Sequence, residues 1–255
     1  MSENKNNQRQ SLLRRTEDLA DRCERTGNVT STGFLTPAEQ YELQRWVDGR
    51  ADIKLHMDGG RDWCERKAAF FLPFWMEAED FSAAEYLRVL HIQAYFGEPS
   101  HRDYLGAALG LGIQREWLGD IQIGEKEAWM FCLPSVEGLL TEEFTKAGHT
   151  TIKAAACLLE EVPEPERKVR RVSFTVKTPR LDAVASSMFG LSRTAAAELI
   201  RLGGASLNYS VCERVDAAVK EGDVISLRGR GKGVLTAFGG KSRKDRLFAE
   251  AEIYQ

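Results

Sequence analysis

A short charged segment divides this chain of 255 residues into two parts of opposite charge. Residues Glu160–Arg171 read EEVPEPERKVRR, which combines two prolines with an absence of apolar periodicity and is typical of a linker. Residues 1–162 carry 18 Lys and Arg against 27 Asp and Glu, whereas residues 163–255 carry 17 against 11. The sequence therefore predicts an acidic body of charge −9 followed by a basic part of charge +6, which suggests a polyanionic partner.

The composition is that of a folded protein outside the membrane. Hydrophobic residues make up 43% of the chain and charged residues 29%, which provides enough apolar side chains for a core. No apolar run approaches the roughly 18–20 residues that a membrane span requires. The N-terminal segment MSENKNNQRQ lacks the apolar stretch of a secretory signal. We therefore expect a cytoplasmic protein with no membrane partner.

The cysteines and histidines show no spacing that is typical of a metal site. No CxxC pair occurs among the five cysteines, and the four histidines form no HExxH motif. We therefore expect buried, reduced thiols, no bound metal and no cofactor. The cysteines are Cys23, Cys64, Cys132, Cys157 and Cys212.

The first 80 residues are predicted to form a small α/β domain. An amphipathic pattern predicts a helix at residues 11–26. A second helix is expected from Thr36-Pro37 to Val47, because Thr is a good N-cap and Pro fits the first helical position. Residues 52–57 and 68–75 have the patterns of strands.

Residues 81–160 are predicted to form a second domain of the α+β class. The expected order is strand, helix, strand, strand, helix, strand, which is the order of a ferredoxin-like domain. RNA-recognition modules share this topology, but so do many metabolic domains, so the topology does not decide the function. The expected elements are a strand at 85–96, a helix at 100–109, strands at 119–123 and 128–133, a helix at 136–147 and a strand at 150–159.

After a linker at residues 161–172, residues 173–240 are predicted to fold as a pair of short helices on a small β-sheet. Apolar residues from Leu181 to Met188 have helical spacing, and Gly190 ends that helix. Ser192 caps the second helix. Short β structure is expected around residue 208 and at 224–228, and residues 241–255 are expected to be a C-terminal tail.

Basic residues of this C-terminal unit recur at positions that can share one face. Arg193 and Arg201 lie two turns apart on the second expected helix, about 12 Å at ~1.5 Å per residue. Both are expected to be exposed, so that reversing their charges leaves the fold intact. Such a face suits the phosphate-rich recognition of structured RNA, although the same side chains could merely solvate the surface. The basic candidates are Arg180, Arg193, Arg201, Arg228, Arg230 and Lys232, the last three on a segment expected to be extended.

The same region resembles the S-four RNA-binding domain, which is named for a small-subunit ribosomal protein. The matching residues are Arg180-Leu181-Asp182, Ser192-Arg193, LIRLGG from Leu199, Asn208, and GDVISLRGRGKGVL from Gly222 to Leu235. The chain departs from the family pattern at Tyr209, where Gly is usual, and at Ala205, where Val is usual. The resemblance implies RNA binding by this unit, and it adds Ser192 and Asn208 to the candidate binding residues.

The body of the chain resembles the bacterial YlmH family, whose members carry a C-terminal S-four domain behind a ferredoxin-like RNA-binding domain. One departure from the family pattern is GGRDWC at residues 59–64. The resemblance implies association with ribosomal RNA and rescue of stalled large ribosomal subunits that carry peptidyl-tRNA. We expect a monomer. The resemblance is carried by FLTPAEQ at 34–40, ERK at 65–67, HRDYLGA at 101–107, LGIQRE at 111–116 and GDI at 119–121.

Two function classes remain open at this point. The first is a non-catalytic RNA-binding factor that acts on the ribosome, which we favour. The alternative is an RNA-modifying enzyme, of the pseudouridine synthase or methyltransferase type, that uses the S-four domain as an anchor. A pseudouridine synthase needs a larger catalytic domain, and a methyltransferase needs a Gly-rich βαβ opening, neither of which the sequence shows.

The segment His101-Arg102-Asp103 contains residue types used in acid–base catalysis. Adjacent residues of a helix point about 100° apart, so His101 and Asp103 are not expected to form a dyad. A helix-capping role is expected for Asp103, and no catalytic residue is assigned. Arg102 and Arg115 are candidates for a second contact with RNA or the ribosome.

Overall fold

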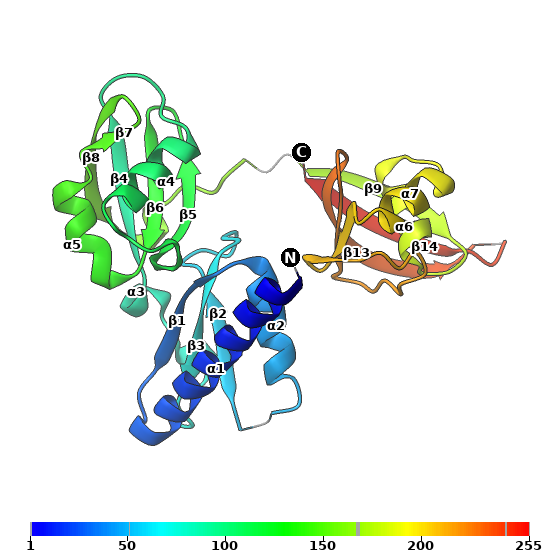
Figure 1. The fold of residues 1–255 in the computed structure, drawn as a ribbon, viewed down its shortest axis with the longest axis horizontal. Coiled ribbons are helices and arrows are strands. Elements are labelled where there is room, and N and C mark those ends of the chain that lie inside the picture. Colours follow the sequence, from blue (N-terminus) through cyan, green and yellow to red (C-terminus); the bar gives the residue numbers. More distant parts are fainter. Residues whose placement is uncertain (1, 51, 167–168, 243, 255) are drawn as a thin grey trace. The chain divides into compact units, whose positions relative to one another are not determined.

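A computed structural model describes the backbone of residues 2–50, 52–166, 169–242 and 244–254 (Figure 1). The described residues form three antiparallel sheets with helices, which confirms the predicted α+β class. They divide into two compact units, Met1–Pro165 and Glu166–Gln255. No helix among the described residues is long and apolar enough to cross a membrane.

The N-terminal part of the first unit is a three-stranded sheet with two helices. Gly27 ends the first helix, which starts nine residues before the predicted one. A capping box starts the second helix as predicted, because the Thr36 amide donates to Glu39 Oε2 at 2.7 Å. The elements are α1 (Ser2–Thr26), β1 (Thr30–Leu35), α2 (Pro37–Val47), β2 (Lys54–Asp58) and β3 (Lys67–Leu72), with the strand order β1-β3-β2.

The central part of the first unit is a five-stranded sheet of order β5-β6-β4-β8-β7. Its principal helices, α4 and α5, cover one face, where Tyr104 and Leu140 are buried against the strands. The elements are the 3-10 helix η1 (Ala78–Asp80), α3 (Ala83–Tyr86), β4 (Arg88–Ala94), α4 (His101–Gly110), the 3-10 helix η2 (Arg115–Trp117), β5 (Leu118–Ile123), β6 (Glu127–Cys132), α5 (Pro134–Glu143), β7 (Lys146–Ala147), β8 (Thr150–Cys157) and the 3-10 helix η3 (Leu159–Glu161).

Two predicted boundaries in this sheet were wrong. The helix expected at 136–147 ends at Glu143, because Lys146 and Ala147 pair with β8 across the turn at Gly148. The strand expected from residue 85 starts at Arg88, because residues 83–86 form a helical turn. In both places tertiary pairing overrides the local pattern.

The two sheets of the first unit share an apolar core. Phe34 and Phe70 of the N-terminal sheet are buried in the same cluster as Val89 and Phe131 of the central sheet. The two predicted domains of the body therefore pack on each other within one compact unit.

The second unit is a six-stranded sheet of order β11-β10-β12-β13-β14-β9, with two helices over one face (Figure 1). Its core contains Leu181, Ile200, Ile225 and Leu235, none of which is exposed. The elements are β9 (Val169–Val176), α6 (Leu181–Phe189), α7 (Arg193–Arg201), β10 (Ala205–Leu207), β11 (Ser210–Val211), β12 (Val224–Leu227), β13 (Gly231–Lys241) and β14 (Leu247–Tyr254).

The expected linker and tail both supply strands to this sheet. β9 starts within residues 161–172, and β14 lies within residues 241–255, where it pairs with both β13 and β9. In β14 the buried Ala249, Ala251 and Ile253 alternate with Glu250 and Glu252. This alternation suits a strand with one face on the core and one in water, so the compact unit is longer than residues 173–240.

Candidate nucleic-acid interface

One buried carboxylate orients two of the candidate arginines. Arg180 is the N-cap of α6 and Arg193 is the first residue of α7, and both bind Asp182. Arg180 Nε lies 3.2 Å from Asp182 Oδ1, and Arg193 Nη2 lies 2.9 Å from Asp182 Oδ2. The Asp182 side chain is 7% exposed, whereas those of Arg180 and Arg193 are 38% and 58% exposed. The carboxylate thus fixes both guanidiniums while leaving part of each accessible.

The charge state of Asp182 follows from these contacts. Burial alone would raise the pKa of Asp182, but the hydrogen bonds from Arg193 and Arg180 hold it below its usual range. The group is therefore ionised at neutral pH. Arg193 is exposed, as expected, but it is also a partner of this buried carboxylate. A glutamate there would face Asp182, so we expect reversal of its charge to destabilise the fold.

Replacing Asp182 by Asn should destabilise the second unit in a pH-dependent way. Because the native pKa of Asp182 is depressed, its ionised form stabilises the fold above the unfolded pKa of about 3.8, and this contribution disappears as pH falls through the native pKa. We expect Asp182→Asn to lower the free energy of unfolding by about 1 kcal/mol at pH 7, with the difference from the natural protein shrinking toward pH 3. Urea unfolding followed by circular dichroism at both pH values measures this. An equal loss at both would mean that packing, and not charge, is responsible.

Three further arginines lie around the C-terminal end of α7. Arg201 belongs to the last turn of α7, and Gly204 follows three residues later. The Arg228 amide donates to the Gly204 carbonyl at 2.8 Å, which places the β12–β13 turn beside this helix end. Arg201, Arg228 and Arg230 are all exposed. We call these three residues the arginine cluster.

The structure corrects the expected geometry of residues 228–232. Residues 228–230 form a turn, so the segment is not extended. Lys232 pairs with Ser226 and Tyr254, and its ammonium lies 5.3 Å from the centroid of the Tyr254 ring. The next residue, Gly233, faces α6, since a Cβ atom there would lie 2.3 Å from Met188 Cε. Successive residues of a strand face opposite sides, so Lys232 lies on the sheet face away from the helices.

The two polar candidates have structural roles in the fold. The Ser192 hydroxyl accepts the Ala195 amide at 3.1 Å as the N-cap of α7. Asn208 Nδ2 donates to Asp223 Oδ1 at 2.8 Å, and Asn208 Oδ1 accepts the Val224 amide at 2.9 Å. These hydrogen bonds explain why Ser and Asn occupy the two positions, whether or not either residue contacts RNA.

The turn that contains Asn208 explains one departure from the S-four pattern. Asn208 and Tyr209 have φ values of 48° and 65°, so both occupy the left-handed region between β10 and β11. A two-residue hairpin turn of this kind favours Asn followed by Gly. Gly is usual at the second position because the turn requires a positive φ there. In this chain Tyr209 adopts that positive φ.

The two candidates in the body, Arg102 and Arg115, differ in exposure. Arg102 is exposed on α4, whereas Arg115 is half-buried and its Nη1 donates to the Leu118 and Gly119 carbonyls at 2.5 and 3.2 Å.

Asp103 caps its helix as predicted, because its Oδ2 accepts the Ser100 amide and hydroxyl at 2.8 and 2.7 Å. These hydrogen bonds lower the pKa of Asp103.

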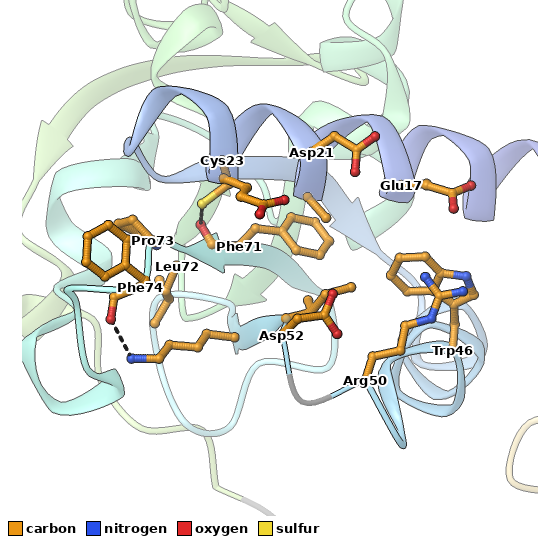
Figure 2. A pocket seen from close by; sticks show the side chains of 14 residues that line it. Glu17, Asp21, Cys23, Trp46, Arg50, Asp52, Phe71, Leu72, Pro73 and Phe74 are labelled. Atoms are coloured by element: carbon orange, nitrogen blue, oxygen red, sulfur yellow. Dashed lines mark hydrogen bonds between the residues drawn. The ribbon is translucent and has the colours of Figure 1, made fainter.

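A pocket of about 670 Å³ lies between α1, the C-terminal end of α2 and strands β2 and β3 of the N-terminal sheet. Figure 2 shows Glu17 and Asp21 projecting from α1 on one side, with Trp46 and Arg50 on the other. The Arg50 guanidinium stacks on the Trp46 ring, 3.9 Å from its centroid. The cation already has a partner and carboxylates dominate the rim, so this pocket does not suit a phosphate backbone.

The cysteines are free, as expected, but not all are buried. Cys23, Cys64 and Cys132 are buried, whereas Cys157 and Cys212 are half-buried. Burial raises the pKa values of Cys64 and Cys132 to about 12, so both thiols are protonated at neutral pH. Among the residues that the structure describes, no group of three or more His, Cys, Asp or Glu side chains could hold a metal ion.

The chain is similar to known proteins in its family, in its sequence and in its fold. A family model described as "Putative RNA-binding domain in YlmH" matches residues 77–161. The chain is 33% identical over 215 residues to the "Ribosome-associated protein quality control protein P2" of Bacillus subtilis (strain 168), covering 84% of this chain and 83% of that protein. Among solved structures, "Cell division protein ylmH from Streptococcus pneumoniae" matches with a TM-score of 0.50 and 18% identity, over 60% of this chain and 92% of that one, which indicates a related fold.

Proposed function

The chain belongs to the YlmH family, and on that premise we propose that it is a non-catalytic, RNA-binding factor of ribosome-associated quality control. The observation that carries the proposal is the arrangement of arginines along α7. Arg180 and Arg193, oriented by Asp182, lie at one end of the helix, and the arginine cluster lies at the other. Exposed guanidiniums spread over about 12 Å suit several phosphates of a folded RNA.

We assign the second unit to the S-four domain class and the central sheet to the ferredoxin-like class. For the second unit, the support is a helix pair on a β-sheet, with the residues of the S-four pattern at the helix ends and turns. For the central sheet, the support is the order β5-β6-β4-β8, with α4 after β4 and α5 after β6. In this scheme the body comprises domains at residues 1–80 and 81–160.

The distribution of charge favours the second unit as the principal RNA contact. The segment matched by the family model, residues 77–161, contains 6 Lys and Arg against 15 Asp and Glu. Such a surface repels a phosphate backbone, whereas the +6 C-terminal part attracts one. The proposed partners are ribosomal RNA of the large subunit and peptidyl-tRNA held on stalled subunits. The name of the Bacillus relative supports association with the ribosome.

Gradient sedimentation tests this function. We expect the purified protein to migrate with large ribosomal subunits at low salt and to leave them as salt rises, because phosphate contacts release counterions. Subunits with and without bound peptidyl-tRNA show whether the tRNA adds affinity. Migration at the top of the gradient with both kinds of subunit at low salt, or stoichiometric modification of the RNA, would contradict the proposal.

A further inference from the structure

A second pocket lies where the N-terminal sheet meets the central sheet, and three arginines line it: Arg15, Arg66 and Arg115. The pocket has a volume of about 510 Å³ and is formed by α1, β1, the start of α2, η2 and the residue before β3. Residues from FLTPAEQ, ERK and LGIQRE, three of the segments that carry the YlmH resemblance, meet here. We call it the arginine pocket, after Arg66 and Arg115.

Arg66 has a donor that no group in the described structure satisfies. Its Nη2 donates to the Phe34 carbonyl at 2.6 Å, which holds the guanidinium against β1. Its Nε is buried and has no hydrogen-bond partner among the described residues. Burial also lowers the pKa of Arg66. An unsatisfied buried donor is destabilising, so an anion that accepted its hydrogen bond would gain affinity.

Arg115 places a second positive charge near the first. Its Nη1 is fixed by the Leu118 and Gly119 carbonyls. Burial, and then the nearby charge of Arg66, lower the pKa of Arg115 to about 10. The two guanidiniums therefore repel each other at a half-buried site, and a bound anion would relieve that repulsion.

The carboxylates around the arginine pocket already have partners. Glu39 Oε2 accepts the Thr36 amide and hydroxyl, each at 2.7 Å. Both oxygens of Glu116 accept Arg15 Nη1, at 3.0 and 3.1 Å. Asp120 accepts the backbone amides of residues 65 and 66, and burial raises its pKa. These carboxylates keep their charge and offset part of the positive charge of the arginines, since Glu39 and Asp120 act against the lowering of the pKa of Arg66.

We propose that the arginine pocket binds a phosphate group, with the guanidiniums of Arg66 and Arg115 as its donors. Planar guanidinium groups bind phosphate through paired hydrogen bonds, and the side chains of Arg66 and Arg115 both line this pocket. The volume lies within the roughly 300–1,000 Å³ range of small-molecule sites, so it admits a mononucleotide as well as free phosphate. A terminal phosphate of an RNA strand offers the same chemistry. This inference does not depend on RNA binding by the second unit.

Calorimetric titration of the full-length protein at constant ionic strength tests the proposal. The probes are inorganic phosphate, adenosine 5′-monophosphate, adenosine, and a short RNA with or without a 5′-phosphate. We expect saturable one-to-one binding of at least one phosphate-bearing probe, and none of adenosine. Binding of the free nucleotide identifies a small-molecule site, whereas tighter binding of the phosphorylated RNA than of its unphosphorylated form identifies an RNA end.

Three variants show where the phosphate binds. Arg115→Gln keeps a donor for the backbone carbonyls but removes the charge, and it should weaken binding by ~10-fold or more, as should Arg66→Gln. Arg22→Gln removes an exposed arginine of the same unit that does not line the pocket, and it should leave affinity unchanged. If both pocket variants fold poorly, phosphate-induced stabilisation of the natural protein in thermal unfolding provides the second measurement.

Two results would overturn the proposal. One is the absence of saturable binding and of thermal stabilisation with every phosphate-bearing probe. The other is binding that survives Arg115→Gln and Arg66→Gln but is lost when the arginine cluster of the second unit is reversed, because the phosphate would then lie on the second unit.

Discussion

The triple variant Arg201→Glu, Arg228→Glu, Arg230→Glu should no longer sediment with large ribosomal subunits at low salt. All three side chains are exposed, and none forms an ion pair with another residue in the described part of the chain. Removing three phosphate contacts should reduce the log–log salt slope by about 3, and reversal adds repulsion, so we expect binding to fall by roughly 100-fold or more. Arg193 is excluded because its contact with Asp182 would mix loss of binding with loss of stability.

A matched control is available at the other end of the same hairpin. Lys220 precedes β12, and Lys241 and Lys244 lie at or beyond the end of β13, so reversing these three gives the same change in net charge. This control variant should retain most of its binding. Equal loss in both variants would indicate non-specific attraction, and retention by the cluster variant would refute the assignment. Melting temperature shows whether either variant is misfolded.

Replacing Gly233 by Ala should cost the second unit about 3 kcal/mol of unfolding free energy, the upper part of the usual range for overpacking. A Cβ atom at this position would lie 2.3 Å from Met188 Cε, 2.6 Å from the Glu252 carbonyl oxygen and 3.2 Å from the Ile253 Cα. Met188 is flexible enough to move, but the backbone of β14 is held by pairing on both sides. The sheet must therefore distort or α6 must move away from it.

The distribution of tryptophan allows this loss to be assigned to one unit. All five tryptophans, at positions 46, 63, 75, 117 and 129, lie in the first unit. In urea, Gly233→Ala should shift the circular dichroism transition of the second unit while the tryptophan fluorescence transition stays in place. Gly240→Ala, on the same strand but with no atom within 4 Å of the added Cβ, is the control and should shift neither. If the dichroism transition of Gly233→Ala were unchanged, the β14 backbone would be able to move aside without loss of stability.

Helix ends were the features that the sequence predicted best. Thr36, Ser100 and Ser192 each cap the helix predicted to follow, and Gly190 ends α6. A helix cap depends on hydrogen bonds between a side chain and backbone groups a few residues away. It can therefore be predicted from a short stretch of sequence. The −9 and +6 charge division likewise follows from composition alone.

Tertiary structure alone decided which candidate residues act together. Asp182 joins Arg180 to Arg193, whereas Lys232, one residue before Gly233 on β13, faces the other side of the sheet. The residues of β14 were expected to form a tail. Their alternating pattern corresponds to a strand only because β9 and β13 pair with it on either side. Each of these outcomes depends on contacts between segments distant in sequence, which local patterns do not encode.

The arginine pocket illustrates the same division. The sequence determined that Arg66 and Arg115 lie in segments resembling one family, and it placed Arg115 among the candidates for a contact with RNA or the ribosome. Only the packing of the two sheets around Phe34, Phe70, Val89 and Phe131 brings the two charges together and buries the Arg66 Nε. The sequence by itself determines local hydrogen bonds and charge. Burial and the proximity of two charges arise only when the sheets pack together.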